Sequence, residues 1–231
     1  MMNYAPVEVC VWGKFACFTR PEMKVERVSY EVMTPSAARG ILEAIFWKPE
    51  FQWQIVEIRV LKPIRFYSIL RNEVNSRANT STAMRHLKGE GSYYSDDSRE
   101  RSQRHTLCLR DVAYCIAAHV ALLPSVEEDE AKYRDQFQRR VKRGQCYTTP
   151  YLGCREFTAS FGPEPPADRE VYLQDITVDL GRMLFDLDYE PGYAGRGTPK
   201  FFEAGLIGGI LRVPETLYKK GGQDNVSGTA E

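Results

Sequence analysis

A tryptophan and a lysine stand side by side at the end of a predicted helix, where an aromatic ring and a cation could act together on a nucleic acid. Trp47 and Lys48 come directly before Pro49, which cannot continue a helix. The ring could stack on a base while the ammonium group pairs with a phosphate. The alternative is that Trp47 packs in the core and Lys48 complements the helix dipole. Both interpretations are open at this point.

Basic residues elsewhere in the chain could add contacts to phosphates. One group lies on a predicted loop between a strand and a helix: Arg20, Lys24 and Arg27. Loops on a rigid scaffold often carry binding residues, although a solvated loop would have the same composition. A polar stretch at about 75–105 interleaves tyrosines with basic residues such as Arg104 and His105. That mixture suits single-stranded RNA, but acidic residues in the stretch nearly balance the charge.

The overall charge does not predict a polyanion partner, because 31 basic and 31 acidic residues give a formal net charge of zero. The distribution is uneven. Four acids lie between residues 125 and 130, and six basic residues lie between 132 and 143, Arg139 and Arg140 among them. This order suits a helix dipole, and a local basic face can bind nucleic acid in a neutral protein.

The six cysteines form no C-x-x-C pair, so the sequence predicts no zinc site and no other metal site. The chain shows no signal peptide and no apolar run of the roughly 20 residues that span a membrane. We therefore expect a cytoplasmic protein with reduced, mostly buried thiols, without cofactors and without a membrane partner.

Hydrophobic periodicity predicts the order strand, helix, strand, strand, helix, strand. These elements span residues 7–18, 34–48, 53–61, 112–122, 127–143 and 151–161. Thr34 is the expected N-cap of the first helix, and Pro35 suits its first position. The order is the split βαβ, ferredoxin-like pattern, which is also the topology of RRM-type RNA binders. A long insertion at about 75–105 separates the second and third strands.

The C-terminal part is predicted to be a smaller unit. A Pro-rich linker follows residue 161, and residues 169–218 contain about three strands with a hairpin turn at Gly208–Gly209. The polar, Gly-rich tail at 219–231 is expected to be disordered. The predicted fold class is thus α+β, with a ferredoxin-like domain at 1–161 and a small antiparallel β-sheet domain at 169–218.

Several motifs occur together in a fixed order. They are Trp12–Pro21, Thr34–Leu42, Trp47–Pro49, Leu61–Pro63, Arg71–Val74, Leu109–Tyr114 and Tyr151–Glu156. Together they resemble the CRISPR-associated Cas-five family of RAMP proteins, in particular its type I-C member, from about residue 7 to 213.

The resemblance implies an endoribonuclease that cleaves precursor crRNA within its repeats, without a metal. It implies that the protein then stays on the 5′ handle of the crRNA in the type I-C interference complex, beside the backbone RAMP subunit and the large subunit. Double-stranded DNA is a further partner that the resemblance leaves open. We expect RNA contacts from Arg20, Lys24, Arg27, Trp47, Lys48, Arg71, Arg104, Arg139 and Arg140.

Metal-free RNA cleavage needs a base for the 2′-hydroxyl, an acid for the 5′-oxygen and a cation for the phosphorane. The family places a tyrosine before the Trp-Lys-Pro motif and a Lys-His pair at the start of the second helix. Here these positions are Phe46, which has no hydroxyl, and Lys132–Tyr133. A tyrosine with a pKa near 10 suits an acid better than a base. Substitutes for the missing base could be His105, His86 or Tyr30.

Two alternatives follow from the altered positions. Phe46 and Tyr133 favour a non-catalytic subunit that caps the crRNA 5′ handle, whereas Lys132 favours the nuclease. Lys132 could also be an ordinary surface cation, and Tyr133 a core residue four positions before Phe137.

Overall fold

The computed structural model describes residues 4–23, 25–75, 79–91, 101–165, 175–189 and 197–218. The predicted phosphate contact of Lys24 and the predicted disordered tail at 219–231 therefore lie outside the described residues, as do parts of the predicted insertion at about 75–105, of the linker after residue 161 and of the C-terminal domain at 169–218.

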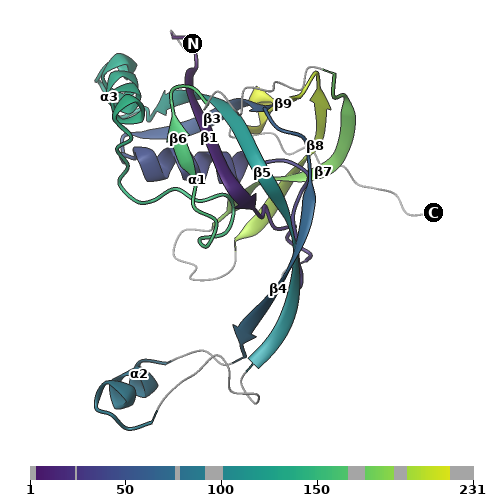
Figure 1. Ribbon diagram of the computed structural model, residues 1–231. Helices are drawn as coiled ribbons and strands as arrows, with labels where there is room; N and C mark the ends of the chain where they lie inside the picture. The colour runs from purple at the N-terminus through teal and green to yellow at the C-terminus, as the bar shows by residue number, and fades with distance from the viewer. Residues whose placement is uncertain are drawn as a thin grey trace, which may run out of the picture.

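Within the described residues, nine strands form one curled sheet that is antiparallel except for the pairing of β2 with β5 (Figure 1). The strands are β1 (Val7–Ala16), β2 (Arg27–Val28), β3 (Phe51–Val60), β4 (Phe66–Val74), β5 (Arg101–Leu122), β6 (Ser160–Gly162), β7 (Val178–Asp188), β8 (Thr198–Ile207) and β9 (Ile210–Arg212). Hydrogen bonds order them β6-β1-β5-β3-β9-β8-β7, with β2 and β4 paired to β5. The predicted α+β class is confirmed.

The α-helices of the described residues are α1 (Pro35–Ile45), α2 (Thr80–Leu87) and α3 (Glu130–Arg143), and a short 3₁₀ helix follows at Glu215–Tyr218. Thr34 is the N-cap of α1 as predicted, because its Oγ1 accepts a hydrogen bond from Ala37 N at 3.3 Å. The predicted start of α3 at residue 127 is wrong by three residues. The helix begins at Glu130, because the side chain of Asp129 caps it and accepts a hydrogen bond from Ala131 N. Gly144 ends α3 in the left-handed conformation. In the described part of the chain, no helix is long and apolar enough to cross a membrane.

The main core lies between the sheet and the helices α1 and α3. The predicted alternation of β1 is confirmed, because Val7, Val9 and Val11 are all buried in this core. Ile41 of α1 and Phe137 of α3 are buried in the same cluster. These contacts fix the C-terminal end of α1 close to α3, with Arg140 of α3 bonded to the last turn of α1.

A two-stranded ribbon projects from the sheet and carries α2 near its far end (Figure 1). The first half of β5 pairs with β4 from Leu109–Phe66 to Arg101–Val74, and its second half pairs with β1 and β3. The described part of the polar insertion predicted at about 75–105 is therefore not irregular throughout. Its described part contains α2, and β5 already begins at residue 101, because ladder hydrogen bonds to β4 extend the strand through polar residues.

The predicted strand at 151–161 is wrong in extent. Only β6 at its end is a strand, and Tyr151 and Thr158 meet in an isolated bridge. Between them Gly153 adopts φ +84°, and Phe157 N donates to Cys154 O at 2.9 Å. A positive φ and a tight turn break the extended backbone that the residue pattern favours.

Gly153→Ala should lower the free energy of unfolding by about 2–4 kcal/mol. A Cβ at this position would overlap the carbonyl oxygen of Cys17, and the positive φ would strain the new residue. Denaturant unfolding measures the effect. Gly144→Ala, which also replaces a glycine of positive φ but meets no atom within 4 Å, should lose less; equal losses would contradict the proposed overlap.

The expectation of reduced thiols is wrong for one pair. Cys10 and Cys115 form a disulfide, because β1 and β5 place them directly opposite each other. Their separation of 105 residues hides this proximity in the sequence. The other four thiols are free; Cys17, Cys108 and Cys154 are buried, whereas Cys146 is exposed.

The C-terminal segment forms the three predicted strands, and β8 turns into β9 at Gly208–Gly209 as expected. β9 also pairs with β3, so the C-terminal strands continue the main sheet. Arg39 of α1 forms an ion pair with Asp186 of β7, which ties this segment to the helix.

Candidate active site

The start of α3 brings together an acid, a cation and a phenol. The carboxylate of Glu128 accepts hydrogen bonds from Lys132 Nζ and from the Tyr133 hydroxyl, one on each oxygen. The Tyr133 ring is buried, with its centroid 5.3 Å from that of Phe51, while the Lys132 side chain is 59% exposed. We call Glu128, Lys132 and Tyr133 the Glu128 cluster.

Electrostatics within the Glu128 cluster keep the proton on the phenol. The hydrogen bond to the Glu128 carboxylate raises the pKa of Tyr133 to about 12. The hydrogen bond from Lys132 lowers the pKa of Glu128. At neutral pH the cluster therefore holds a charged carboxylate and a neutral phenol that can donate a proton, beside the basic side chain of Lys132.

Glu128 is the member of the cluster that the sequence pattern does not single out, because it stands in a run of acids. One signal was available. Glu128 precedes Lys132 by four residues, a spacing at which opposite charges meet on a helix.

The exposed turn after α1 lies beside this cluster. Phe46 is buried, with its ring 5.6 Å from Phe51, so it supports the aromatic wall behind Tyr133. Lys48 is exposed, and its charge contributes to the lowered pKa of Glu128. The two lysines therefore lie near one carboxylate from two different elements.

Trp47 is 56% exposed, which excludes the alternative that it packs in the core. The core tryptophan of this region is Trp53, which is 2% exposed and donates its indole N–H to Phe46 O at 3.0 Å. A half-exposed ring at the end of a packed helix is available for stacking.

Trp47→Ala should change the free energy of unfolding by less than about 1 kcal/mol, and if Trp47 stacks on RNA as the sequence predicts, the replacement should weaken RNA binding. Trp53→Ala, the matched control, should lower stability by about 3–5 kcal/mol. Thermal unfolding and filter binding of repeat RNA measure the two effects. If Trp47→Ala lowered the free energy of unfolding as much as Trp53→Ala does, Trp47 would be a structural residue and not a stacking platform.

The two arginines of α3 in the predicted RNA-binding set differ in environment. Arg140 Nη1 donates to Ile45 O at 2.9 Å, and its guanidinium lies 5.3 Å from the Phe46 ring. It closes the end of α1. Arg139 is exposed and borders a shallow cavity of about 310 Å³ with Asp135, Gln138, Lys142 and Arg143.

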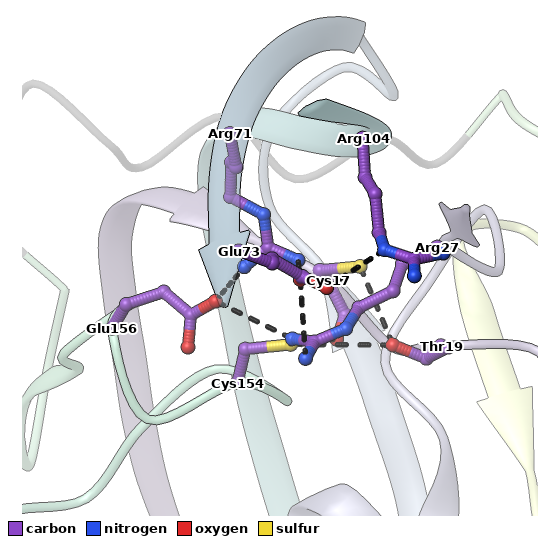
Figure 2. A network of polar contacts seen from close by, with 8 residues as sticks. All are labelled: Cys17, Thr19, Arg27, Arg71, Glu73, Arg104, Cys154 and Glu156. Atoms are coloured by element: carbon purple, nitrogen blue, oxygen red, sulfur yellow. Dashed lines mark hydrogen bonds and ion pairs between the residues drawn. The ribbon is translucent and has the colours of Figure 1, made fainter. Parts of the chain in front are cut away.

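Three further predicted RNA-binding residues meet in a separate arginine network, made of Arg27, Arg71, Arg104, Glu73 and Glu156 (Figure 2). Arg71 bonds to Glu156, and its Nη2 lies 3.1 Å from Glu73 Oε1. Arg104 Nε lies 3.3 Å from the other oxygen of Glu73. Arg27 reaches Glu156 at 3.4 Å and donates to Cys154 Sγ at the same distance.

The arginine network joins β2, β4, β5 and the loop after α3. Three guanidinium groups face two carboxylates, so the network keeps a positive excess while its side chains are held in place. The two acids, Glu73 and Glu156, are the partners that the predicted set omitted. Outside the network, Arg20 pairs with Glu31 at 2.9 Å and lies 4.4 Å from the Tyr30 ring.

The three candidates for a replacement base do not join the Glu128 cluster. His105 pairs with Leu70 on the β4–β5 ribbon, where its Nδ1 lies 3.3 Å from Ser68 Oγ. His86 belongs to α2 at the end of that ribbon. Tyr30 is 1% exposed, and its hydroxyl accepts a hydrogen bond from Leu184 N. The structure thus brings Lys132 and Tyr133 together with Lys48, but not with His105.

A family profile described as CRISPR-associated protein (Cas_Cas5) matches residues 7–214. The chain therefore belongs to the Cas5 family of CRISPR-associated proteins.

Two curated relatives carry the more specific description "CRISPR pre-crRNA endoribonuclease Cas5d". The protein from Thermus thermophilus is 45% identical, and the match covers 94% of both chains. The protein from Mannheimia succiniciproducens is 45% identical over 90% of this chain and 94% of its own.

Solved structures agree with the fold. A structure described as a CRISPR-associated protein matches with a TM-score of 0.64 at 22% identity, covering 93% of this chain and 94% of that chain. A functionally uncharacterized protein from Streptococcus mutans matches with a TM-score of 0.62 at 19% identity, covering 93% and 95%.

Proposed function

We propose that this protein is a pre-crRNA endoribonuclease, the activity that the descriptions of its two relatives name, and that it cuts within the repeat. The observation that carries the proposal is the Glu128 cluster. It combines an exposed cation with a protonated phenol beside the Trp47–Lys48 turn. Those are two of the three groups that RNA transesterification needs.

The proposed reaction is attack of the 2′-oxygen on the adjacent phosphorus, with breakage of the bond from phosphorus to the 5′-oxygen. Lys132 stabilises the negative charge of the phosphorane. Tyr133 donates its proton to the departing 5′-oxygen. The 2′-hydroxyl proton leaves to water, because Phe46 has no hydroxyl to accept it. The products carry a 2′,3′-cyclic phosphate and a 5′-hydroxyl, and no metal takes part.

We place the reaction on a ferredoxin-like domain at 1–161. Support comes from the strand order β6-β1-β5-β3, with α1 and α3 packed against the sheet. In that arrangement the insertion at about 75–105 lies at the end of the projecting ribbon and contains α2, and the small C-terminal β domain at 169–218 is built on β7, β8 and β9, which extend the same sheet.

The proposed RNA path uses the exposed cations near both sites. Lys48 and Arg139 would contact phosphates close to the cut, and the arginine network would hold the flanking strand. After cleavage the protein would stay on the crRNA 5′ handle, within a cytoplasmic type I-C complex with the backbone RAMP subunit and the large subunit. Double-stranded DNA is a further candidate ligand for the same cations.

One feature favours a different function, a non-catalytic cap on the 5′ handle: Phe46 stands where the resemblance to the family leads us to expect a tyrosine. Incubation of the purified protein with its cognate repeat RNA, followed by gels that resolve products and complexes, separates the two. A single cut within the repeat supports the nuclease. Tight binding without a cut would support the cap.

A further inference from the structure

A groove runs between the second half of α1 and the loop that follows α3. Its volume is about 710 Å³, within the range of about 300–1,000 Å³ that ligand pockets occupy. Its lining includes Gly40, Glu43, Trp47, Tyr147, Tyr151 and Arg155. We call it the aromatic groove.

The loop side of the aromatic groove is held in place by backbone hydrogen bonds. Tyr147 N and Thr148 N both donate to Ala44 O of α1, at 2.8 and 3.1 Å. Further along, Leu152 is fully buried and donates its backbone N–H to Phe157 O. The exposed rings of this loop therefore project from a fixed backbone, and binding would require little ordering.

Three large aromatic side chains that line the groove are exposed to solvent. Tyr147 is 81% exposed, Trp47 56% and Tyr151 41%. Arg155 is exposed and forms no ion pair or hydrogen bond with the other residues that the structure describes. Large aromatic rings gathered on a rigid surface beside Arg155, a cation without a partner among the described residues, indicate a binding site.

We propose that the aromatic groove binds unpaired nucleotides of RNA, whose bases stack on Trp47, Tyr147 and Tyr151 while Arg155 contacts a phosphate. The inference rests on the proposed function for the identity of the RNA and names the part of the substrate that this site takes. Aromatic rings beside cations are the usual means of holding single strands. The carboxylate of Glu43, paired to Arg39 at 3.4 Å, supplies an acceptor for a base amino group.

The position of the groove links it to the Glu128 cluster. Trp47 lines the groove, and the next residue, Lys48, is near enough to Glu128 to influence its pKa. A single strand that leaves the groove past Lys48 therefore arrives at Lys132 and Tyr133. The groove would hold the nucleotides next to the cut.

Gly40 provides a way to fill the groove without disturbing the fold. It lies exposed in the middle of α1, and a Cβ built there meets no atom within 4 Å. Replacement of a mid-helix glycine by leucine improves helix propensity. Gly40→Leu should therefore leave the protein folded while its side chain occupies the space of a base.

The test uses a single-stranded oligoadenylate with one 2-aminopurine, whose fluorescence falls when the base stacks. Tyr147→Ala and Gly40→Leu should each weaken its binding by about fivefold or more and reduce the quenching. Tyr147→Phe, the matched control that keeps the ring, should bind within about twofold of the unmodified protein. The proposal is overturned if the unmodified protein does not bind the probe, or if Tyr147→Ala and Gly40→Leu both bind it normally.

Cleavage of repeat RNA by the same variants separates this inference from the proposed function. If the unmodified protein cuts the repeat and the groove variants cut and bind normally, the groove proposal alone fails. If the unmodified protein binds the probe through the groove but never cuts, the nuclease proposal alone fails.

Discussion

Lys132→Ala should lower the rate of repeat-RNA cleavage by about 10²–10³-fold, the usual effect of removing one charge-stabilising donor from a transition state. Affinity for the uncut repeat should change only severalfold, because the side chain stabilises the phosphorane more than the ground state. Single-turnover cleavage and filter binding, measured on the same preparations, give the two values.

Lys142→Ala is the matched control, since Lys142 lies on the same helix but borders the shallow cavity beside Arg139. It should leave the cleavage rate within about threefold of the unmodified protein. If Lys132→Ala reduced rate and affinity equally, Lys132 would be a phosphate anchor without a role in the chemical step.

Tyr133→Phe should reduce cleavage by about 10²-fold or more, because the leaving 5′-oxygen loses its proton donor. The fold should be retained, since the aromatic ring still packs against Phe51. Tyr133→Ala is less useful, because it would remove the proton donor and also open a cavity in the core, so a loss of activity could come from either change. A cleavage rate unchanged by Tyr133→Phe would exclude the phenol as the acid.

Glu128→Gln should change the pH dependence of the same step. With the carboxylate present, the hydrogen bond holds the pKa of Tyr133 at about 12, so the phenol stays protonated beyond about pH 10, where a free tyrosine ionises. Removing the negative charge should move the pKa toward the ordinary value near 10, so the alkaline loss of activity should move to lower pH. Rates corrected for spontaneous hydrolysis test this. If the pH at which activity falls on the alkaline side were the same in Glu128→Gln as in the unmodified protein, the assigned role of Glu128 would be wrong.

Local signals in the sequence predicted α1 well. Thr34 and Pro35 begin the helix, the apolar stripe is buried, and the chain leaves the helix before Pro49. The alternation of β1 and the glycine turn between β8 and β9 were also predicted correctly, because each depends on residues close together in the chain.

Features that depend on contacts between distant segments could not be predicted in this way. The polar first half of β5 is extended because β4 pairs with it along its whole length. The disulfide between Cys10 and Cys115 requires the register of β1 on β5. The loop at 151–159 turns where Gly153 meets the backbone of Cys17, whereas its residue types favour a strand.

The candidate site shows the same limit. Trp47 and Lys48 could be recognised from the end of their helix, and Lys132 and Tyr133 from the family motifs. The role of Glu128 depends on two hydrogen bonds that no motif encodes. The arginines of the network were selected for their charge, but their pairing with Glu73 and Glu156 depends on four separate segments of the chain.

The most direct test of the proposed chemistry is the identity of the ends that the protein leaves on its repeat RNA in excess EDTA. Transesterification through Lys132 and Tyr133 predicts a 2′,3′-cyclic phosphate on the upstream fragment and a 5′-hydroxyl on the downstream fragment. A 3′-hydroxyl with a 5′-phosphate, or cleavage that appears only when a divalent metal is restored, would contradict it.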